Sequence, residues 1–229
     1  MRLRVFTAFS GYDSQCLALE RVAERHTDFS FDLVGWSEID KHAIMAHNAI
    51  FPQWAGRNYG DISEIDWAQV PDFDLFTYSF PCTNISNAGK QEGFTEGSGT
   101  SSALLWECRR AIEAKRPGFL ILENVKALTS NKFKPLFQKW IDMLKEYGYV
   151  SFWKVVNAKD QGVPQNRERV FLVSFLQPQP FKFPDSMPLL TKLRDVLEES
   201  VDEKYFLPQD KVDSFLERCD QNGLLGGEK

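Results

Sequence analysis

The 229-residue sequence predicts an α/β protein: a mostly parallel sheet with helices on both faces. Short apolar runs of strand length alternate with amphipathic runs of helix length as far as about residue 176. The last two strand-like runs are joined by a segment too short for a crossover helix, so they are expected to pair antiparallel. Polar motifs follow or end several of these runs, which places them together at the carboxyl edge of the sheet.

In the first half of the chain, the strands are expected where apolar residues run together, as in buried parallel strands. These runs are residues 3–9, 31–36 and 73–78, with a short strand at 58–62. A helix is expected at 15–25, where apolar residues recur at helical spacing. The polar segment Ser37-Glu38-Ile39-Asp40 can cap a second helix that runs to about residue 49.

The second half begins with a long polar segment, residues 80–100, that is rich in Asn, Gly and Ser. Such loops inside a compact domain are usually functional or disordered. Helices are expected at 101–115 and 132–147, and the second is amphipathic, with apolar residues at Phe133, Leu136, Phe137, Trp140, Ile141, Leu144 and Tyr147. The remaining strands are expected at 119–122, 150–157 and 169–176, and short helices around 193–199 and 211–219, before an end at 223–229 that is expected to fray.

Length and composition fit one domain with an appendage. A hydrophobic content of 43% with 14% aromatics supplies a sizeable core and argues against disorder. No apolar run approaches the roughly 20 residues of a membrane helix, and the N-terminus reads as a first strand rather than a secretory signal. We expect a domain at 1–180 followed by an acidic extension at 181–229.

The charge of the chain is unevenly distributed. Its net charge is −5, and residues 181–229 hold 7 basic and 11 acidic residues, leaving 20 and 21 in the preceding part. The near-neutral body can hold a local basic groove, although the total charge gives no support for nucleic-acid binding. The four cysteines and three histidines show neither CxxC nor metal-ligand spacing. No metal site or disulfide framework is expected, and a reducing cytoplasm is the natural compartment.

Three motifs carry the chemistry: Phe80-Pro81-Cys82, Glu123-Asn124-Val125 and Gln165-Asn166-Arg167-Glu168-Arg169. Together they supply a thiol, a carboxyl and two guanidinium groups, which suit addition of a nucleophile to a pyrimidine ring. The alternatives are a buried structural cysteine and surface arginines. A cysteine after proline at a strand end, opening a polar loop, is a poor place for a core residue.

A second group of motifs suits a nucleoside-like ligand. The turn at Ser10-Gly11 opens the first crossover, where a helix N-terminus can face a ligand. Glu38, at the end of the second strand, suits hydrogen bonds to ribose hydroxyls, and Asp61 suits an adenine amino group. The alternatives are a plain turn, a helix-cap carboxylate and a solvated loop aspartate.

These segments, in this order, resemble the cytosine-C5 DNA methyltransferases, which use S-adenosylmethionine. The resemblance covers about residues 3–176 and is carried by Phe9-Ser-Gly11, Leu17-Ala-Leu-Glu20, Glu38-Ile-Asp40, Gly60-Asp61-Ile62, Phe80-Pro-Cys82 with Ser86 and Gly89-Lys-Gln91, Glu123-Asn-Val125 and Gln165-Asn-Arg-Glu-Arg169.

The resemblance implies a Rossmann-like methyltransferase fold and methylation of a flipped-out cytosine in duplex DNA. Cys82 would attack C6, Glu123 would protonate or hydrogen-bond N3, and Arg169, with Arg167 beside it, would contact the base. S-adenosylmethionine would be bound by Phe9, Ser10, Gly11, Tyr12, Glu38, Ile39, Asp61, Ile62 and Pro81. Residues 83–99 would form a lid.

The sequence departs from the family in three places. Tyr12-Asp13-Ser14 stands where the family usually has further glycines, and Thr83 stands where it usually has Gln. The third is the absence of a target-recognition region and of the final Gly-Asn-containing helix after it. Residues 181–229 are then the start of a truncated recognition region, and the chain is a truncated form, half of a split enzyme or a degenerate copy. A second chain can supply the missing region.

The function expected is that of a prokaryotic or phage restriction–modification methylase in the cytoplasm. A tRNA cytosine-C5 methyltransferase and a non-autonomous subunit of a split methylase are the alternatives, as is a non-catalytic remnant, which would have no reason to keep Cys82, Glu123 and Arg169 together. A cysteine protease is disfavoured because none of His26, His42 and His47 lies near a strand-end motif.

Overall fold

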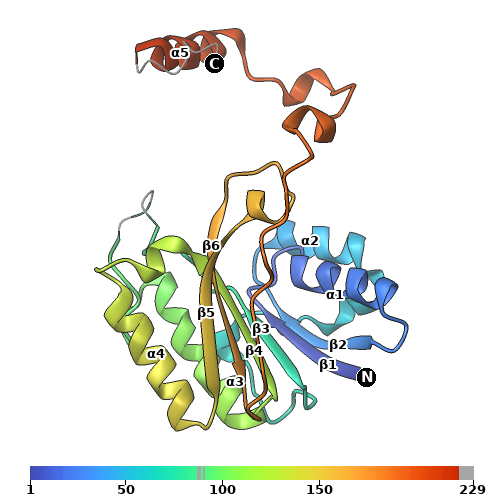
Figure 1. Ribbon diagram of the computed structural model, residues 1–229, viewed down its shortest axis with the longest axis vertical. Coiled ribbons are helices and arrows are strands. Elements are labelled where there is room, and N and C mark those ends of the chain that lie inside the picture. The colour runs from blue at the N-terminus through green and yellow to red at the C-terminus, as the bar shows by residue number, and fades with distance from the viewer. Residues whose placement is uncertain (87–88, 90, 222–229) are drawn as a thin grey trace. The chain divides into compact units, whose positions relative to one another are not determined.

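The computed structural model describes residues 1–86, 89 and 91–221. The chain forms two compact units, Met1–Leu189 and Leu190–Lys229 (Figure 1). The first unit holds the sheet, its covering helices and every motif singled out above.

A six-stranded sheet with the order β2-β1-β3-β4-β6-β5 is the framework of the first unit. Its strands are β1 (Arg2–Ala8), β2 (Ser30–Ser37), β3 (Leu75–Tyr78), β4 (Phe119–Val125), β5 (Val150–Asn157) and β6 (Glu168–Phe175). The first four pair in parallel, whereas β6 runs antiparallel to both β4 and β5. The predicted α/β class, the mostly parallel sheet and the antiparallel final pair are therefore confirmed.

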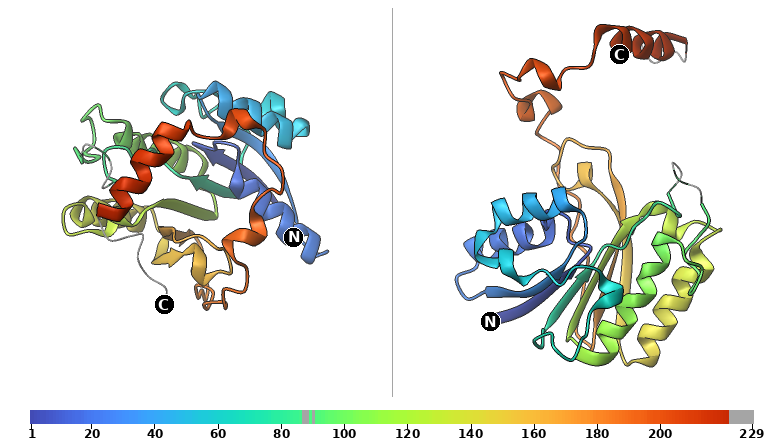
Figure 2. Two further views of the ribbon diagram at one scale, coloured as in Figure 1. Left: turned by 90° about the horizontal axis from the view of Figure 1, so that it is seen from above. Right: turned by 180° about the vertical axis from the view of Figure 1, so that it is seen from behind.

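Helices cover both faces of this sheet. The pair α1 (Ser14–Arg25) and α2 (Lys41–Ile50) lies on one side, and α3 (Glu107–Lys115) and α4 (Lys134–Glu146) lie on the other, as the opposite views in Figure 1 and Figure 2 agree. The apolar face of α4 buries Phe137, Trp140 and Leu144 as its sequence spacing predicts. Burial of each such side chain contributes about 2–3 kcal/mol.

The predicted strand at 58–62 is wrong. Asn58 makes a single bridge to Trp36, and a short 3₁₀ helix, η2 (Ile62–Glu64), follows. Between them Gly60 adopts a φ of 72°, which no strand residue has. Ile62 therefore fills the core from a 3₁₀ turn, whereas Tyr59 is 36% exposed.

The predicted end of the fourth strand at residue 122 is also wrong, because β4 continues to Val125. Its last three residues, including Glu123 and Asn124, stay paired with β6. The predicted helix at 101–115 begins as a 3₁₀ helix, η3 (Ser101–Trp106), before α3.

The second unit contains the 3₁₀ helices η6 (Leu193–Val196) and η7 (Glu203–Tyr205) and the helix α5 (Gln209–Gln221). None of these three elements buries a residue. The helix predicted at 211–219 is confirmed with wider bounds, whereas the one predicted at 193–199 is a single 3₁₀ turn. The end predicted to fray, 223–229, lies outside the described residues.

Within the described ranges, no helix combines the length and apolar character needed to cross a membrane. Cys16, Cys82, Cys108 and Cys219 are all free thiols. In the same ranges, no group of three or more His, Cys, Asp or Glu side chains is arranged to hold a metal ion.

Candidate active site

A cleft of about 680 Å³ opens at the carboxyl ends of β1, β3 and β4. One wall is the turn between β1 and α1, and the other is formed by β4 and the segment that leads into β6. Its lining is Phe9, Ser10, Tyr12, Ser14, Gln15, Ala18, Thr77, Ser79, Ile121, Glu123, Gln165, Arg167 and Phe171. The fold therefore brings the predicted cofactor turn and part of the predicted catalytic set to one cavity.

The turn between β1 and α1 has an unusual backbone, with positive φ at Phe9 (55°), Gly11 (58°) and Asp13 (66°). Asp13 adopts the left-handed conformation at the N-cap of α1, where the family usually has glycine. Its buried carboxylate accepts hydrogen bonds from the Cys16 N–H (3.1 Å) and the Thr7 hydroxyl (2.6 Å). These bonds offset the cost of the conformation and keep the turn tight without a second glycine.

Glu38 closes this turn from β2. Its carboxylate accepts the N–H of Gly11 at 2.9 Å and, through its other oxygen, the N–H groups of Ile39 (2.8 Å) and Asp40 (2.9 Å). Asn58 is bonded to both backbone groups of Glu38, so the loop that follows is fixed beside β2.

That loop carries the other predicted cofactor residues. The Asp61 carboxylate accepts two bonds from Ser63, and Ile62 is buried in the core. Ile39 is 68% exposed. These three residues lie outside the lining of the cleft, so their assignment stays a prediction.

The loop that carries the half-buried Cys82 is fixed at two successive carbonyls. The buried Asn124 amide donates to the Phe80 carbonyl at 2.9 Å, and the Ser102 hydroxyl donates to the Pro81 carbonyl at 2.6 Å. The Cys82 carbonyl in turn accepts the N–H groups of Ile85 and Ser86. Pro81 and Cys82 are therefore anchored from β4 and η3, although neither lines the cleft.

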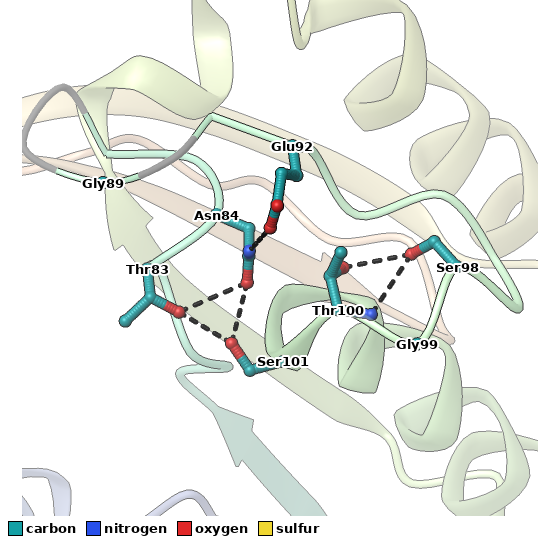
Figure 3. Close-up of a pocket in the computed structure, with 8 residues that line it drawn as sticks. All are labelled: Thr83, Asn84, Gly89, Glu92, Ser98, Gly99, Thr100 and Ser101. Atoms are coloured by element: carbon teal, nitrogen blue, oxygen red, sulfur yellow. Dashed lines mark hydrogen bonds between the residues drawn. The ribbon is translucent and has the colours of Figure 1, made fainter.

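The following polar loop has its own network around an open pocket of about 800 Å³ (Figure 3). Thr83 and Ser101 share a hydrogen bond of 2.6 Å between hydroxyls, and Ser101 donates to the Asn84 amide oxygen. The Asn84 amide nitrogen reaches Glu92 at 2.5 Å. Thr83, the departure from the family pattern, thus ties the base of the predicted lid to η3. Residues 87, 88 and 90 of that lid lie outside the described residues.

Glu123 and Arg169 form an ion pair of 3.1 Å between Oε1 and Nε, with both side chains about one-quarter exposed. The antiparallel register produces it: Glu123 pairs with Phe171 and Val125 with Arg169, so both side chains share one face of the sheet. Burial raises the pKa of Glu123, while Arg169, Arg167 and the Ser79 hydroxyl act in the opposite direction. A carboxyl whose pKa is raised by burial keeps its proton more readily than a free one, which suits a group that donates a proton or a hydrogen bond.

Several polar residues of this cleft, among them Gln15 and Ser79, are absent from the site residues predicted from sequence. Ser79 stands between an apolar strand and Phe80-Pro81-Cys82, and a lone hydroxyl at that position is the signal that could have drawn attention to it. Gln15 carries no comparable signal because a glutamine in a helix is ordinarily a solvated side chain.

A family model, the C-5 cytosine-specific DNA methylase, matches residues 3–227. The chain belongs to this family. Among curated relatives, the type II methyltransferase M2.ScrFI of Lactococcus lactis subsp. cremoris is 38% identical over 92% of this chain and 71% of its own length. The type II methyltransferase M.NlaX of Neisseria lactamica is 36% identical over 83% and 59%, and the orphan methyltransferase M.SPRI of Bacillus phage SPR is 30% identical over 97% and 56%.

Solved structures agree with the fold of this C-5 cytosine-specific DNA methylase family member. The S. pombe Dnmt2 methyltransferase superposes with a TM-score of 0.69 at 17% identity, over 94% of this chain and 66% of that one. The Entamoeba histolytica methyltransferase EhMeth gives a TM-score of 0.66 at 20% identity, over 93% and 65%. The chain thus spans 56% to 71% of the length of the relatives compared here.

Proposed function

We propose that this chain is the catalytic portion of a DNA (cytosine-5-)-methyltransferase that forms a covalent adduct between Cys82 and C6 of a flipped-out cytosine. The observation that carries the proposal is the single cleft that joins the β1–α1 turn to Glu123, which is itself paired with Arg169. Family membership supports the same reading.

The turn fits S-adenosylmethionine, which supplies an electrophilic methyl group when bound. The Ser10 hydroxyl is buried and has no hydrogen-bond partner among the residues described, yet it lines the cleft. A side chain at Gly11 would meet no described atom within 4 Å, so space for a ligand exists beside the backbone. Phe9, Ser10, Gly11 and Tyr12 would hold the cofactor, with Glu38 bracing the turn and Asp61 and Ile62 beside it.

The chain's own residues account for activation of the base. The Cys82 thiolate adds to C6, and the proton that Glu123 delivers or shares at N3 stabilises the adduct, which makes C5 nucleophilic. Once C5 is methylated, loss of its proton and cleavage of the Sγ–C6 bond release 5-methylcytosine and restore the thiolate. Arg167 and Arg169 would hold the base carbonyl or a phosphate. C6 is inaccessible in a duplex, so the cytosine must flip out of the helix.

A region that reads the DNA target is the further part of this proposal, carried on a second chain or on a further segment of a longer polypeptide. Residues 181–229 would form the start of it. The greater length of the relatives supports this, as does an apolar groove of about 630 Å³ between α1 and the sheet, which Phe181 and Phe183 border. Because the three curated relatives named above are bacterial and phage proteins, two of them type II methyltransferases, we propose a restriction–modification role in a prokaryotic cytoplasm.

The proposal is tested by transfer of labelled methyl from S-adenosylmethionine to cytosine-containing duplex DNA, with tRNA in parallel. Wild-type protein, Cys82→Ser and Glu123→Gln would be compared, with and without an added recognition segment from a relative. We expect the wild-type protein to label DNA and Cys82→Ser to transfer no label. Glu123→Gln should transfer methyl groups more slowly than wild type by about 10²–10⁴-fold. Label in tRNA alone, or label that persists in Cys82→Ser, contradicts the proposal.

Cofactor binding is measured separately by calorimetry. Ser10→Ala should weaken binding of S-adenosylmethionine by about 5–10-fold because one hydrogen bond is lost. Equal affinity of the wild-type protein and Ser10→Ala for S-adenosylmethionine would show that Ser10 does not contact the cofactor.

A further inference from the structure

Ser79 and Gln15 connect the cofactor side of the cleft to Glu123. Ser79 lies directly after β3, and Gln15 is the second residue of α1. The Gln15 amide nitrogen Nε2 is 3.0 Å from the Ser79 hydroxyl oxygen, and both side chains are half-buried. All three side chains, Gln15, Ser79 and Glu123, line the same cleft.

The sheet register places Ser79 beside Glu123. Tyr78 pairs with Leu122 in the parallel β3–β4 ladder, so the next residue of each chain is Ser79 and Glu123. Both side chains line the cleft, and the Ser79 hydroxyl acts to lower the pKa of Glu123. A chain of three polar side chains therefore runs from α1 across the end of β3 to β4.

The direction of this chain is fixed by the chemistry of its members. An amide nitrogen can only donate, so the Ser79 oxygen must accept from Gln15, and its single proton is free to point to Glu123. The amide oxygen of Gln15 is itself occupied by the Ser14 hydroxyl at 3.2 Å, which sets the orientation of the amide group. The order is Gln15 to Ser79 to Glu123.

We propose that Gln15 and Ser79 are positioning residues for Glu123, which hold its carboxyl against the base-binding side of the cleft and tie it to the helix that follows the cofactor turn. This inference rests on the proposed function, in which Glu123 acts at N3 of cytosine. Arg169 alone holds one oxygen of the carboxyl, and a second anchor is needed to fix the plane of the group.

The charged and polar groups that face Glu123 determine the pKa that a titration of this carboxyl should measure. Arg169 and Arg167 approach from β6 and the segment before it, and Tyr12 lines the cleft from the β1–α1 turn. On the described parts of α1 and β3 that line this cleft, Gln15 and Ser79 present neutral groups. A donor aimed at a carboxylate stabilises its charged form, so removal of the Ser79 hydroxyl should raise the pKa of Glu123.

The experiment is ¹³C NMR titration of the glutamate carboxyl carbons, with the Glu123 signal assigned by its loss in Glu123→Gln. We expect Ser79→Ala to raise the pKa of Glu123 by about 0.5–1 pH unit, and Gln15→Ala to raise it less. The double variant should match Ser79→Ala, because Gln15 acts only through Ser79. Ser79→Thr, which keeps the hydroxyl, should restore the wild-type value.

Methyl transfer gives the second readout. Both alanine variants should lower kcat by about 5–20-fold and leave KM for DNA and binding of S-adenosylmethionine within about twofold. Ser151→Ala is the matched control, since this half-buried serine bonds Ser174 elsewhere in the sheet and should leave the pKa of Glu123 unchanged.

An unchanged Glu123 titration in Ser79→Ala, or additive effects of the two substitutions, would overturn the inference. The titration needs no turnover, so it tests this connection even if the chain transfers no methyl group with the added recognition segment, a result that would count against the proposed function alone. If Ser79→Ala fails to fold, Gln15→Ala and Ser79→Thr decide the question with the same measurement.

Discussion

Replacement of Asn124 by alanine tests the claim that β4 holds the nucleophile loop in place. The Asn124 side chain is buried, donates to the Phe80 carbonyl at 2.9 Å and accepts the Val125 N–H at 2.8 Å. Phe80 is itself 2% exposed, so water cannot readily replace the lost donor. The substitution therefore orphans a buried carbonyl two residues before Cys82.

The expected cost follows from that geometry. An unsatisfied buried carbonyl costs about 1–3 kcal/mol, and for a domain of this size each 1 kcal/mol lowers Tm by about 2–4 °C. A central value of about 2 kcal/mol thus predicts a fall of roughly 4–8 °C. Displacement of Cys82 by about 1 Å would reduce kcat on the order of 100-fold.

Thermal unfolding followed by circular dichroism gives the first quantity, and methyl transfer at 20 °C, where the variant is still folded, gives the second. Tyr149→Phe is the matched control, because the buried Tyr149 hydroxyl donates to the Pro117 carbonyl at 2.7 Å near the opposite end of β4. It should lose similar stability and keep its kcat. Equal kcat losses in the two variants, or an unchanged Tm in Asn124→Ala, would refute the reasoning.

Three further substitutions have defined outcomes. Asp74→Asn should cost about 0.5–1 kcal/mol at pH 7, because Asp74 binds Arg4 through two oxygens. Since Arg4 lowers the pKa of Asp74 from its ordinary value of 3.8, that stability is lost as pH falls through the lowered pKa, and the two Tm values should converge below it. Gly35→Ala would place a Cβ 2.7 Å from the Phe6 ring and should cost about 1–3 kcal/mol in urea unfolding. Burial raises the pKa of Glu123, so wild-type stability falls as pH rises from the free-carboxyl pKa of 4.5 through the raised pKa of Glu123. Glu123→Gln should gain Tm relative to wild type over that rise in pH, and a constant difference would argue against it.

The fold was largely predictable because its signals are local. Apolar runs and helical spacing located all six strands and the four helices of the first unit, and the short β5–β6 connection predicted their antiparallel pairing. The strand expected at 58–62 is wrong because the chain turns at Gly60 and Ile62 enters the core from a 3₁₀ helix. The length of β4 was missed because its last residues are polar and stay extended only through their pairing with β6.

The candidate site, too, was predictable only where its signals are local. The positions of the motifs at strand ends predicted that the turn at Phe9–Tyr12 lies near Glu123 and Arg167, and these residues line one cleft. It did not predict that Asp13 takes the left-handed backbone of a glycine, because that depends on bonds to Thr7 and Cys16.

The register of β4 against β6 explains why the sequence predicts where the site lies but not which of its side chains contact one another. A shift of one residue would send Arg169 to the opposite face from Glu123 and remove the ion pair, with no change in any motif. The register is set by the apolar pairs Leu122–Leu172 and Ile121–Val173 below the site. Hydrophobic packing in the middle of the sheet therefore determines which charges meet at its edge.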